Sequence, residues 1–236
     1  MFKSVARGVV RPVARVLYRP TVEGRERVPR SGPVLFASNH LSFIDSVVIT
    51  LIAPRDVRFL AKAEYFTGEG AKGRLSKTFF ESIGAIPVDR ASNSAAQDSL
   101  ESGREVLDGG GAFAIYPEGT RSRDGRLYRG RTGVAWLALT TGCPVVPVAL
   151  TGTEELLPVD AKVPRIRPVT IRFGEPIDPA AYGEASSARA RRKLTDDVMA
   201  AIGEMSGQEL AGAYNEPPAA NVVERVRRAL HRNDPS

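Results

Sequence analysis

The 236-residue sequence has only one cysteine and two histidines. A single cysteine excludes an intramolecular disulfide, and two histidines leave no plausible zinc-ligand cluster. We therefore expect no metal site and a reducing, cytoplasmic setting. The cysteine, Cys143, has no histidine near it in the sequence. We interpret it as a small packed residue and not as a nucleophile.

Long apolar runs are missing as well. No stretch approaches the roughly 20 apolar residues of a membrane-spanning helix, and the N-terminus lacks the apolar core of a signal peptide. Any contact with a membrane is then expected to be peripheral. The sequence also has no G-x-S-x-G nucleophile elbow, which disfavours a serine hydrolase.

What the chain has is enough apolar material for a core and an excess of positive charge. With 42% hydrophobic residues, its length predicts one α/β domain and makes two unlikely. The formal charge of +6 implies attraction to an anionic partner, such as a membrane surface, a nucleic acid or a phosphorylated substrate. A nucleic acid is disfavoured, because neither a recognition helix nor an aromatic RNA-binding motif is present.

Residues 1–20 carry a cation at every fourth position, with valines and other apolar residues on the opposite side of a helical wheel. This pattern predicts a basic amphipathic helix at an anionic membrane surface, kinked or divided at Pro12. The alternative is a helix that packs on its own domain and leaves its basic side in water. Residues 21–236 are assigned to the single domain.

The stretch Ser38-Asn39-His40-Leu41-Ser42-Phe43-Ile44-Asp45 joins a strand-like apolar run to a helix-like one. His40 then lies where a strand ends, and Asp45 falls in the first turn of the next helix. This placement suits a general base whose imidazole is oriented by a carboxylate. The same residues also fit a helix capping box, with Ser42 as the N-cap and Asp45 three residues on. On the residues alone, both interpretations stand.

Three cationic residues follow other strand-like runs. Lys62 follows 57–61, Arg90 closes 83–90, and Arg121 lies in the turn after 113–116. In an open sheet such strand ends share one rim, and arginine can hold a phosphate with two parallel hydrogen bonds. Each residue also has a simpler interpretation as a solvated side chain or an ordinary turn.

The turn before Arg121 holds two more candidates. Gly119 would let the backbone approach a ligand, and Thr120 offers a hydroxyl and a backbone donor. Gly68-x-Gly70-x-x-Gly73 formally matches a dinucleotide-binding fingerprint, but it does not directly follow a strand. We therefore predict a flexible basic surface loop there, containing Lys72, Arg74 and Lys77.

Asn39-His40-x-Ser42-x-x-Asp45 resembles the NHxSxxD motif of the glycerolipid acyltransferases, the family of 1-acylglycerol-3-phosphate acyltransferase. Further blocks fit the same family in order and spacing, and together they cover roughly residues 34 to 150. They are Lys62-Ala63-Glu64-Tyr65-Phe66, the run 83–90, Tyr116-Pro117-Glu118-Gly119-Thr120-Arg121-Ser122 with Tyr116 in place of phenylalanine, and the strand 145–150.

The resemblance implies an O-acyltransferase that moves an acyl group from acyl-CoA or acyl carrier protein to a hydroxyl of a lysophosphatidate-like acceptor. His40 would deprotonate that hydroxyl and Asp45 would orient His40, with no covalent acyl-enzyme and no cofactor beyond the thioester co-substrate. Lys62, Arg90 and Arg121 would bind phosphate, and Glu118 would hold Arg121 or a glycerol hydroxyl. Arg131 stands where the family has a lysine, which alters the geometry of a phosphate contact.

We read the whole chain as one α/β domain with a mixed central sheet flanked by helices, peripheral on the inner face of the cell membrane. Two other functions stay open: acyl transfer to another polar lipid, and a catalytically idle lipid-phosphate-binding protein on the same fold. Beyond the motifs, the patterns predict helices over 94–107, through Trp136 to Gly142, and over 186–205, with a last basic helix around 222–230.

Overall fold

The computed structural model describes residues 18–89, 95–159, 161 and 163–216. The predicted interfacial helix of residues 1–20 falls almost wholly outside the described residues. So do Arg90 and the predicted last basic helix. The division of the chain at residue 20 therefore stays a prediction.

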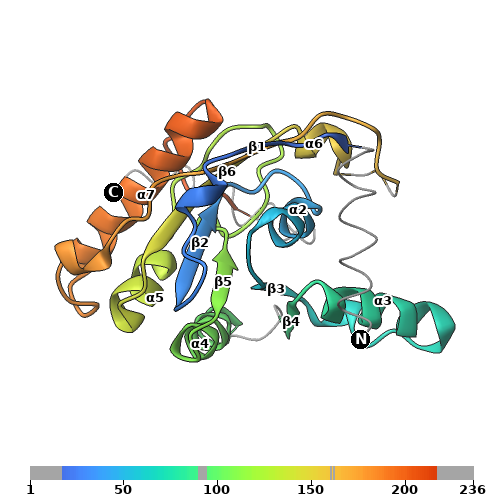
Figure 1. Cartoon of the computed structure of the whole chain (residues 1–236), viewed down its shortest axis with the longest axis horizontal. Coiled ribbons are helices and arrows are strands. Elements are labelled where there is room, and N and C mark those ends of the chain that lie inside the picture. Colours follow the sequence, from blue (N-terminus) through green and yellow to red (C-terminus); the bar gives the residue numbers. More distant parts are fainter. Residues whose placement is uncertain (1–17, 90–94, 160, 162, 217–236) are drawn as a thin grey trace, which may run out of the picture.

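A single seven-stranded sheet forms the centre of the described chain, in the order β1-β7-β6-β2-β5-β3-β4 (Figure 1). Neighbouring strands run parallel, except that β6 and β7 are antiparallel. The mixed sheet flanked by helices confirms the predicted fold class. The strands are β1 (Thr21–Glu23), β2 (Val34–Ser38), β3 (Val57–Lys62), β4 (Ala85–Val88), β5 (Ala112–Ile115), β6 (Val145–Thr151) and β7 (Thr170–Phe173).

The helices cover both faces of this sheet. Those of the described chain are α2 (Asp45–Ile52), α3 (Gly70–Ser82), α4 (Ala95–Asp108), α5 (Gly133–Thr141), α6 (Thr153–Leu156) and α7 (Ala188–Ser206). Short 3₁₀ turns are η1 (Arg25–Arg27), η2 (Ala63–Tyr65) and η3 (Pro179–Ala181). None of the helices described is long and apolar enough to cross a membrane.

Strand β2 shows why the central strands are almost continuously apolar. All five of its residues are buried, because helices pack on both of its faces. Phe36 belongs to a cluster with Ile49 of α2, and Leu35 to a cluster on the opposite face with α4, α5 and α7. Cys143 is fully buried in that second cluster, as predicted.

The loop predicted around Gly68 and Gly73 is wrong, because residues 70–82 form helix α3. A Cβ atom at Gly73 would lie 1.8 Å from the carbonyl oxygen of Gly68, so these glycines let the helix start pack against the chain that precedes it. Phe80 then fixes the helix to the sheet, where it is buried with Phe59. Gly68 and Gly73 are therefore explained by packing, and Gly70 by its positive φ of 70°.

Candidate active site

The site lies at the carboxyl ends of three adjacent parallel strands. Strand β5 pairs with β2 on one side and with β3 on the other. His40 follows β2, the turn that contains Arg121 follows β5, and Lys62 is the last residue of β3. The topology thus brings together residues that are up to about 80 positions apart, at the rim where open α/β sheets bind ligands.

His40 and Asp45 form a close pair. The Nδ1 atom of His40 lies 2.8 Å from Oδ2 of Asp45, whose side chain is fully buried, whereas the His40 side chain is 16% exposed. Because the carboxylate only accepts hydrogen bonds, it places the imidazole proton on Nδ1. The other ring nitrogen, Nε2, is then free to accept a proton.

The capping-box interpretation is met only in part. Asp45 Oδ2 accepts the backbone N–H groups of Leu41 at 2.7 Å and Ser42 at 2.8 Å, which is the backward half of such a box. The hydroxyl of Ser42, however, donates to the carbonyl oxygen of Leu157 at 2.7 Å and caps no helix. Asp45 therefore both shapes the turn before α2 and orients His40.

Glu118 has a different role from the one expected. Its carboxylate is fully buried and accepts the backbone N–H groups of His40 at 2.9 Å and Tyr128 at 3.0 Å. Within the described residues, Glu118 thus holds the backbone of the site and makes no hydrogen bond or ion pair with Arg121, whereas its predicted contact with a substrate hydroxyl stays a prediction. Burial raises the pKa of Glu118 to about 7, although the two backbone hydrogen bonds favour the charged form and lower it.

The backbone of His40 is held on both sides by the turn after β5. Its N–H group donates to Glu118, and its carbonyl oxygen accepts the N–H of Ser122 at 2.8 Å. The imidazole in turn stacks on the ring of Tyr116, with centroids 3.9 Å apart. His40 is therefore positioned before any substrate binds.

Tyr116, which stands where the family motif has phenylalanine, adds a hydroxyl to the site. This hydroxyl lies 2.7 Å from the Oγ atom of Ser46 on α2. Burial, reinforced by the charge of Asp45, raises the pKa of Tyr116 well above its usual value, so the phenol stays protonated. The sequence comparison with the motif revealed the substitution but not the stack on His40.

A cavity opens beside His40 and has one cationic and one apolar side. Lys62 and Arg121 line it together with His40, as the shared rim predicts. The rest of its wall is mainly aromatic and aliphatic. It includes Phe43, Val47, Phe59, Leu60, Tyr65, Phe80, Ile83 and Tyr116. These aromatic residues come from separate segments of the chain, and no common sequence signal marked them as one wall.

Arg131 is directed to the C-terminal segment and is not among the residues that line the cavity beside His40, and its predicted contact with a phosphate stays a prediction. Its guanidinium donates to the carbonyl oxygen of Asn215 at 3.2 Å and lies over the ring of Tyr214. Asn215 in turn donates to the carbonyl oxygens of Thr120 and Arg121. Arg131 and Asn215 therefore support the turn that carries Arg121.

Gly119 is required at its position in this turn. Its backbone has a φ of 79°, and a Cβ atom there would lie 3.0 Å from Nε of Arg131. The turn can therefore fold over Arg131 only with glycine at this position. This finding assigns Gly119 a conformational role, and its predicted approach to a ligand stays a prediction.

Asn39 is a residue of the motif whose role the sequence did not reveal. Its side-chain amide accepts the backbone N–H of Leu150 at 2.8 Å and donates to the carbonyl oxygen of the same residue at 2.9 Å. Asn39 thereby extends the pairing of β2 with β6 beyond the end of β2. The strand end that carries His40 is fixed by this contact.

Within the described part of the chain, no three side chains of histidine, cysteine, aspartate or glutamate gather into a set that could hold a metal ion. The chemistry of the site rests on one imidazole–carboxylate pair, two cations and an apolar wall. Such a set can deprotonate a hydroxyl and bind an anionic group beside an alkyl chain.

Comparison with known proteins identifies the family of the chain. The family model described as Acyltransferase matches residues 19–151, which is more than half of the chain. The chain belongs to the acyltransferase family. The prediction made from its motifs is thereby confirmed at the level of the family.

Several curated relatives in this family carry the name 1-acyl-sn-glycerol-3-phosphate acyltransferase. A chloroplastic protein of that name from Arabidopsis thaliana is 33% identical over 147 residues, which are 61% of this chain and 39% of that protein. One from Cocos nucifera is 31% identical over 158 residues, 66% of this chain and 49% of that protein. The chain spans about two fifths to a half of the length of these relatives.

A solved structure extends the similarity over most of the fold. The crystal structure of the 1-acyl-sn-glycerophosphate acyltransferase PlsC from Thermotoga maritima matches with a TM-score of 0.62 and 26% sequence identity. The match covers 86% of this chain and 82% of that one. The α/β domain of this family is therefore the architecture of the described residues.

Proposed function

We propose that this chain transfers a fatty acyl group from a thioester, acyl-CoA or acyl carrier protein, to the free hydroxyl of a lysophosphatidate-like acceptor. The observation that carries the proposal is the His40–Asp45 pair at 2.8 Å on the wall of a cavity that also contains Lys62 and Arg121. The cavity thus contains a base, two cations that can bind an anion, and an apolar wall. The names of the relatives point to the same reaction.

The reaction proceeds as one direct displacement. Nε2 of His40 takes the proton of the acceptor hydroxyl while that oxygen attacks the thioester carbonyl carbon. Asp45 stabilises the imidazolium that forms. The tetrahedral intermediate then expels the thiolate, which receives the proton from His40, so that the products are the acylated lipid and a free thiol. No covalent acyl-enzyme is required.

Two substrate contacts follow from the cavity wall. The guanidinium of Arg121 and the ammonium of Lys62 bind the phosphate of the acceptor, and the aromatic and aliphatic wall receives alkyl chain. Arg90 is proposed to join them, although it lies outside the described residues. We further propose that the protein works at an anionic membrane surface on the cytoplasmic side, to which residues 1–20 contribute.

The decisive experiment measures acyl transfer to lysophosphatidate and to a matched acceptor that lacks the phosphate. His40→Ala should lower kcat about 10² to 10⁴-fold on both acceptors, because it removes the base. Arg121→Ala should raise KM for lysophosphatidate about 10- to 150-fold, the equivalent of losing about 1.5 to 3 kcal/mol of hydrogen bonding to a charged group. It should change KM for the phosphate-free acceptor far less.

Arg123→Ala is the matched control, because Arg123 is exposed in the segment that follows the same turn. It should leave both KM values near those of the wild type. If Arg121→Ala raised KM equally for both acceptors, the acceptor would be another polar lipid. Full activity of purified His40→Ala would refute the mechanism, and lipid binding without turnover by the wild type would indicate an idle binding protein.

A further inference from the structure

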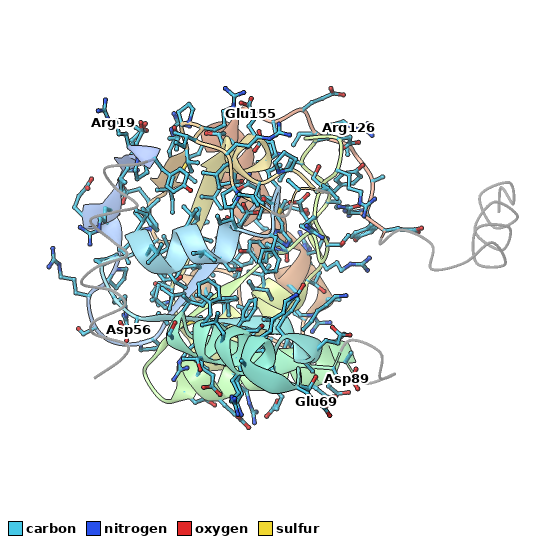
Figure 2. The ribbon with its side chains drawn as sticks, turned by 90° about the vertical axis from the view of Figure 1, so that its right-hand side faces the viewer. Arg19, Asp56, Glu69, Asp89, Arg126 and Glu155 are labelled. Carbon is cyan, nitrogen blue, oxygen red and sulfur yellow. The ribbon has the colours of Figure 1, made fainter. Side chains whose placement is uncertain are left out.

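Helix α3 lies on the side of the sheet that also carries α2 (Figure 2). It exposes two large apolar side chains to solvent. Leu75 is 71% exposed and Phe79, one helical turn further on, is 44% exposed. Lys72 lies three residues before Leu75 and seven before Phe79, so all three fall on one side of the helix. We call Lys72, Leu75 and Phe79 the α3 stripe.

The α3 stripe is continuous with the wall of the cavity. The ring of Phe79 contacts that of Phe80, which stacks on Tyr65 at 4.7 Å and meets Phe43 edge-on at 6.0 Å. Phe80, Tyr65 and Phe43 all line the cavity that contains His40. Phe43 is itself 38% exposed. A series of ring contacts therefore leads from the exposed side of α3 to the wall of the cavity that contains His40.

The charges of α3 complement an anionic surface. The helix contains Lys72, Arg74 and Lys77 but only one acidic residue, Glu81, which lies 3.9 Å from Lys77. Exposed apolar side chains next to cations are typical of helices that lie in the interface of a bilayer with anionic lipids. A surface that merely faces water gains nothing from exposing Leu75 and Phe79.

We propose that the α3 stripe docks on an anionic bilayer and holds the mouth of the cavity against it. The acyl chain of a membrane-borne acceptor then moves from the bilayer along Phe79, Phe80 and Phe43 into the cavity. This inference rests on the proposed function, because it takes the substrate to be a lipid. It is separate from the interfacial helix predicted for residues 1–20.

Leu75→Asp tests the docking directly, with Leu210→Asp as the matched control. Leu210 is 69% exposed and lies in the C-terminal segment beside Leu127, away from the aromatic series. Binding of the full chain to vesicles of 70% phosphatidylcholine and 30% phosphatidylglycerol is measured by co-sedimentation. Leu75→Asp should weaken binding about tenfold or more, since a buried leucine contributes enough for that factor. Leu210→Asp should leave it unchanged.

A second measurement reports on the location of the α3 stripe even if another segment also binds lipid. Leu75→Trp places an indole on the stripe, and Leu210→Trp places one on the control position. The native tryptophan, Trp136, packs against the cluster on the opposite face of the sheet and provides the background. Lipids brominated on their acyl chains should quench the fluorescence of Leu75→Trp and not that of Leu210→Trp or the wild type.

The outcomes separate this inference from the proposed function. Turnover of a water-soluble, short-chain phosphorylated acceptor should be the same in Leu75→Asp and the wild type, and its absence in both would refute the function instead. Equal vesicle binding by Leu75→Asp and Leu210→Asp, together with no quenching at position 75, overturns the docking. Unchanged vesicle binding with a raised KM for acyl carrier protein would also overturn it, and would assign the α3 stripe to that acidic donor.

Discussion

Glu118→Gln should reveal an ionisation that opposes folding near neutral pH. Burial raises the pKa of Glu118 from 4.5 to about 7. The folded state then holds the proton more tightly than the unfolded state. Glu118 therefore makes its full contribution to the free energy of unfolding below pH 4.5. This contribution is lost as the pH rises through about 7. A difference of this size corresponds to about 3 kcal/mol of unfolding free energy.

Glutamine cannot ionise, so the variant lacks this pH dependence. It should still be less stable than the wild type in acid. The amide NH₂ group of glutamine is a donor, and it would face the backbone N–H of either His40 or Tyr128, which is also a donor. Such a mismatch costs about 1 to 3 kcal/mol. The stability difference between wild type and variant should therefore shrink, or change sign, between pH 4 and pH 8.

The assay is urea unfolding of both proteins at several pH values, with Glu204→Gln on the exposed side of α7 as the control. The free energy of unfolding of the wild type should fall relative to that of Glu118→Gln by about 3 kcal/mol as the pH rises over this range. That of Glu204→Gln should follow the wild type. Parallel curves for wild type and Glu118→Gln would refute the reasoning. They would mean that the backbone hydrogen bonds offset burial, so that the pKa of Glu118 is the same in the folded and unfolded states.

Three further substitutions test separate contacts of the site. Asp45→Asn keeps the shape of the turn but removes the charge that stabilises protonated His40, so kcat should fall about 10²-fold or more with little change in KM. Tyr116→Phe keeps the stack on His40 and loses only the hydroxyl contact with Ser46, so unfolding free energy should fall by about 1 kcal/mol while kcat stays within about threefold. Asn39→Ala removes the partner of both the N–H and the carbonyl group of Leu150 in β6. Urea unfolding should show that the free energy of unfolding falls by about 2 to 3 kcal/mol.

The strands could be located from the sequence because each central strand is buried on both faces and reads as a short apolar run. Strand β2 is the clearest case, with five buried residues in succession. Helix α3 could not be located in this way. Gly70 and Gly73 disfavour a helix locally. Tertiary contacts such as the stack of Phe80 on Tyr65 favour it, and they cannot be read from a local pattern.

The site could be located but not fully assigned. The spacing of His40 and Asp45 predicted their pairing, because both lie in one local turn. The partner of Glu118 was not predictable in the same way, since it is the backbone N–H of His40, 78 residues earlier in the chain. Every residue except proline has a backbone N–H, so the residue type at a position does not indicate that its backbone is the partner of a distant side chain. The contact of Arg131 within the chain was not predictable for the same reason, because its acceptor is the carbonyl oxygen of Asn215.

These contacts divide the motif residues into two groups with different tasks. Asn39, Asp45 and Glu118 direct their polar atoms largely at backbone groups, and together with the ring of Tyr116 they fix the position of His40. The imidazole that we propose as the base is therefore held in place by the fold itself.

Lys62 and Arg121 line the cavity and lie at the ends of strands. Lys62 is exposed and Arg121 is half-buried. Long side chains in that setting can follow the position of an anionic head group, which a buried and fully bonded group cannot do. Under the proposed function, the fold thus separates a rigid element for proton transfer from an adaptable element for head-group binding. Substitutions at the rim can then change which acceptor is bound while the geometry around His40 is retained.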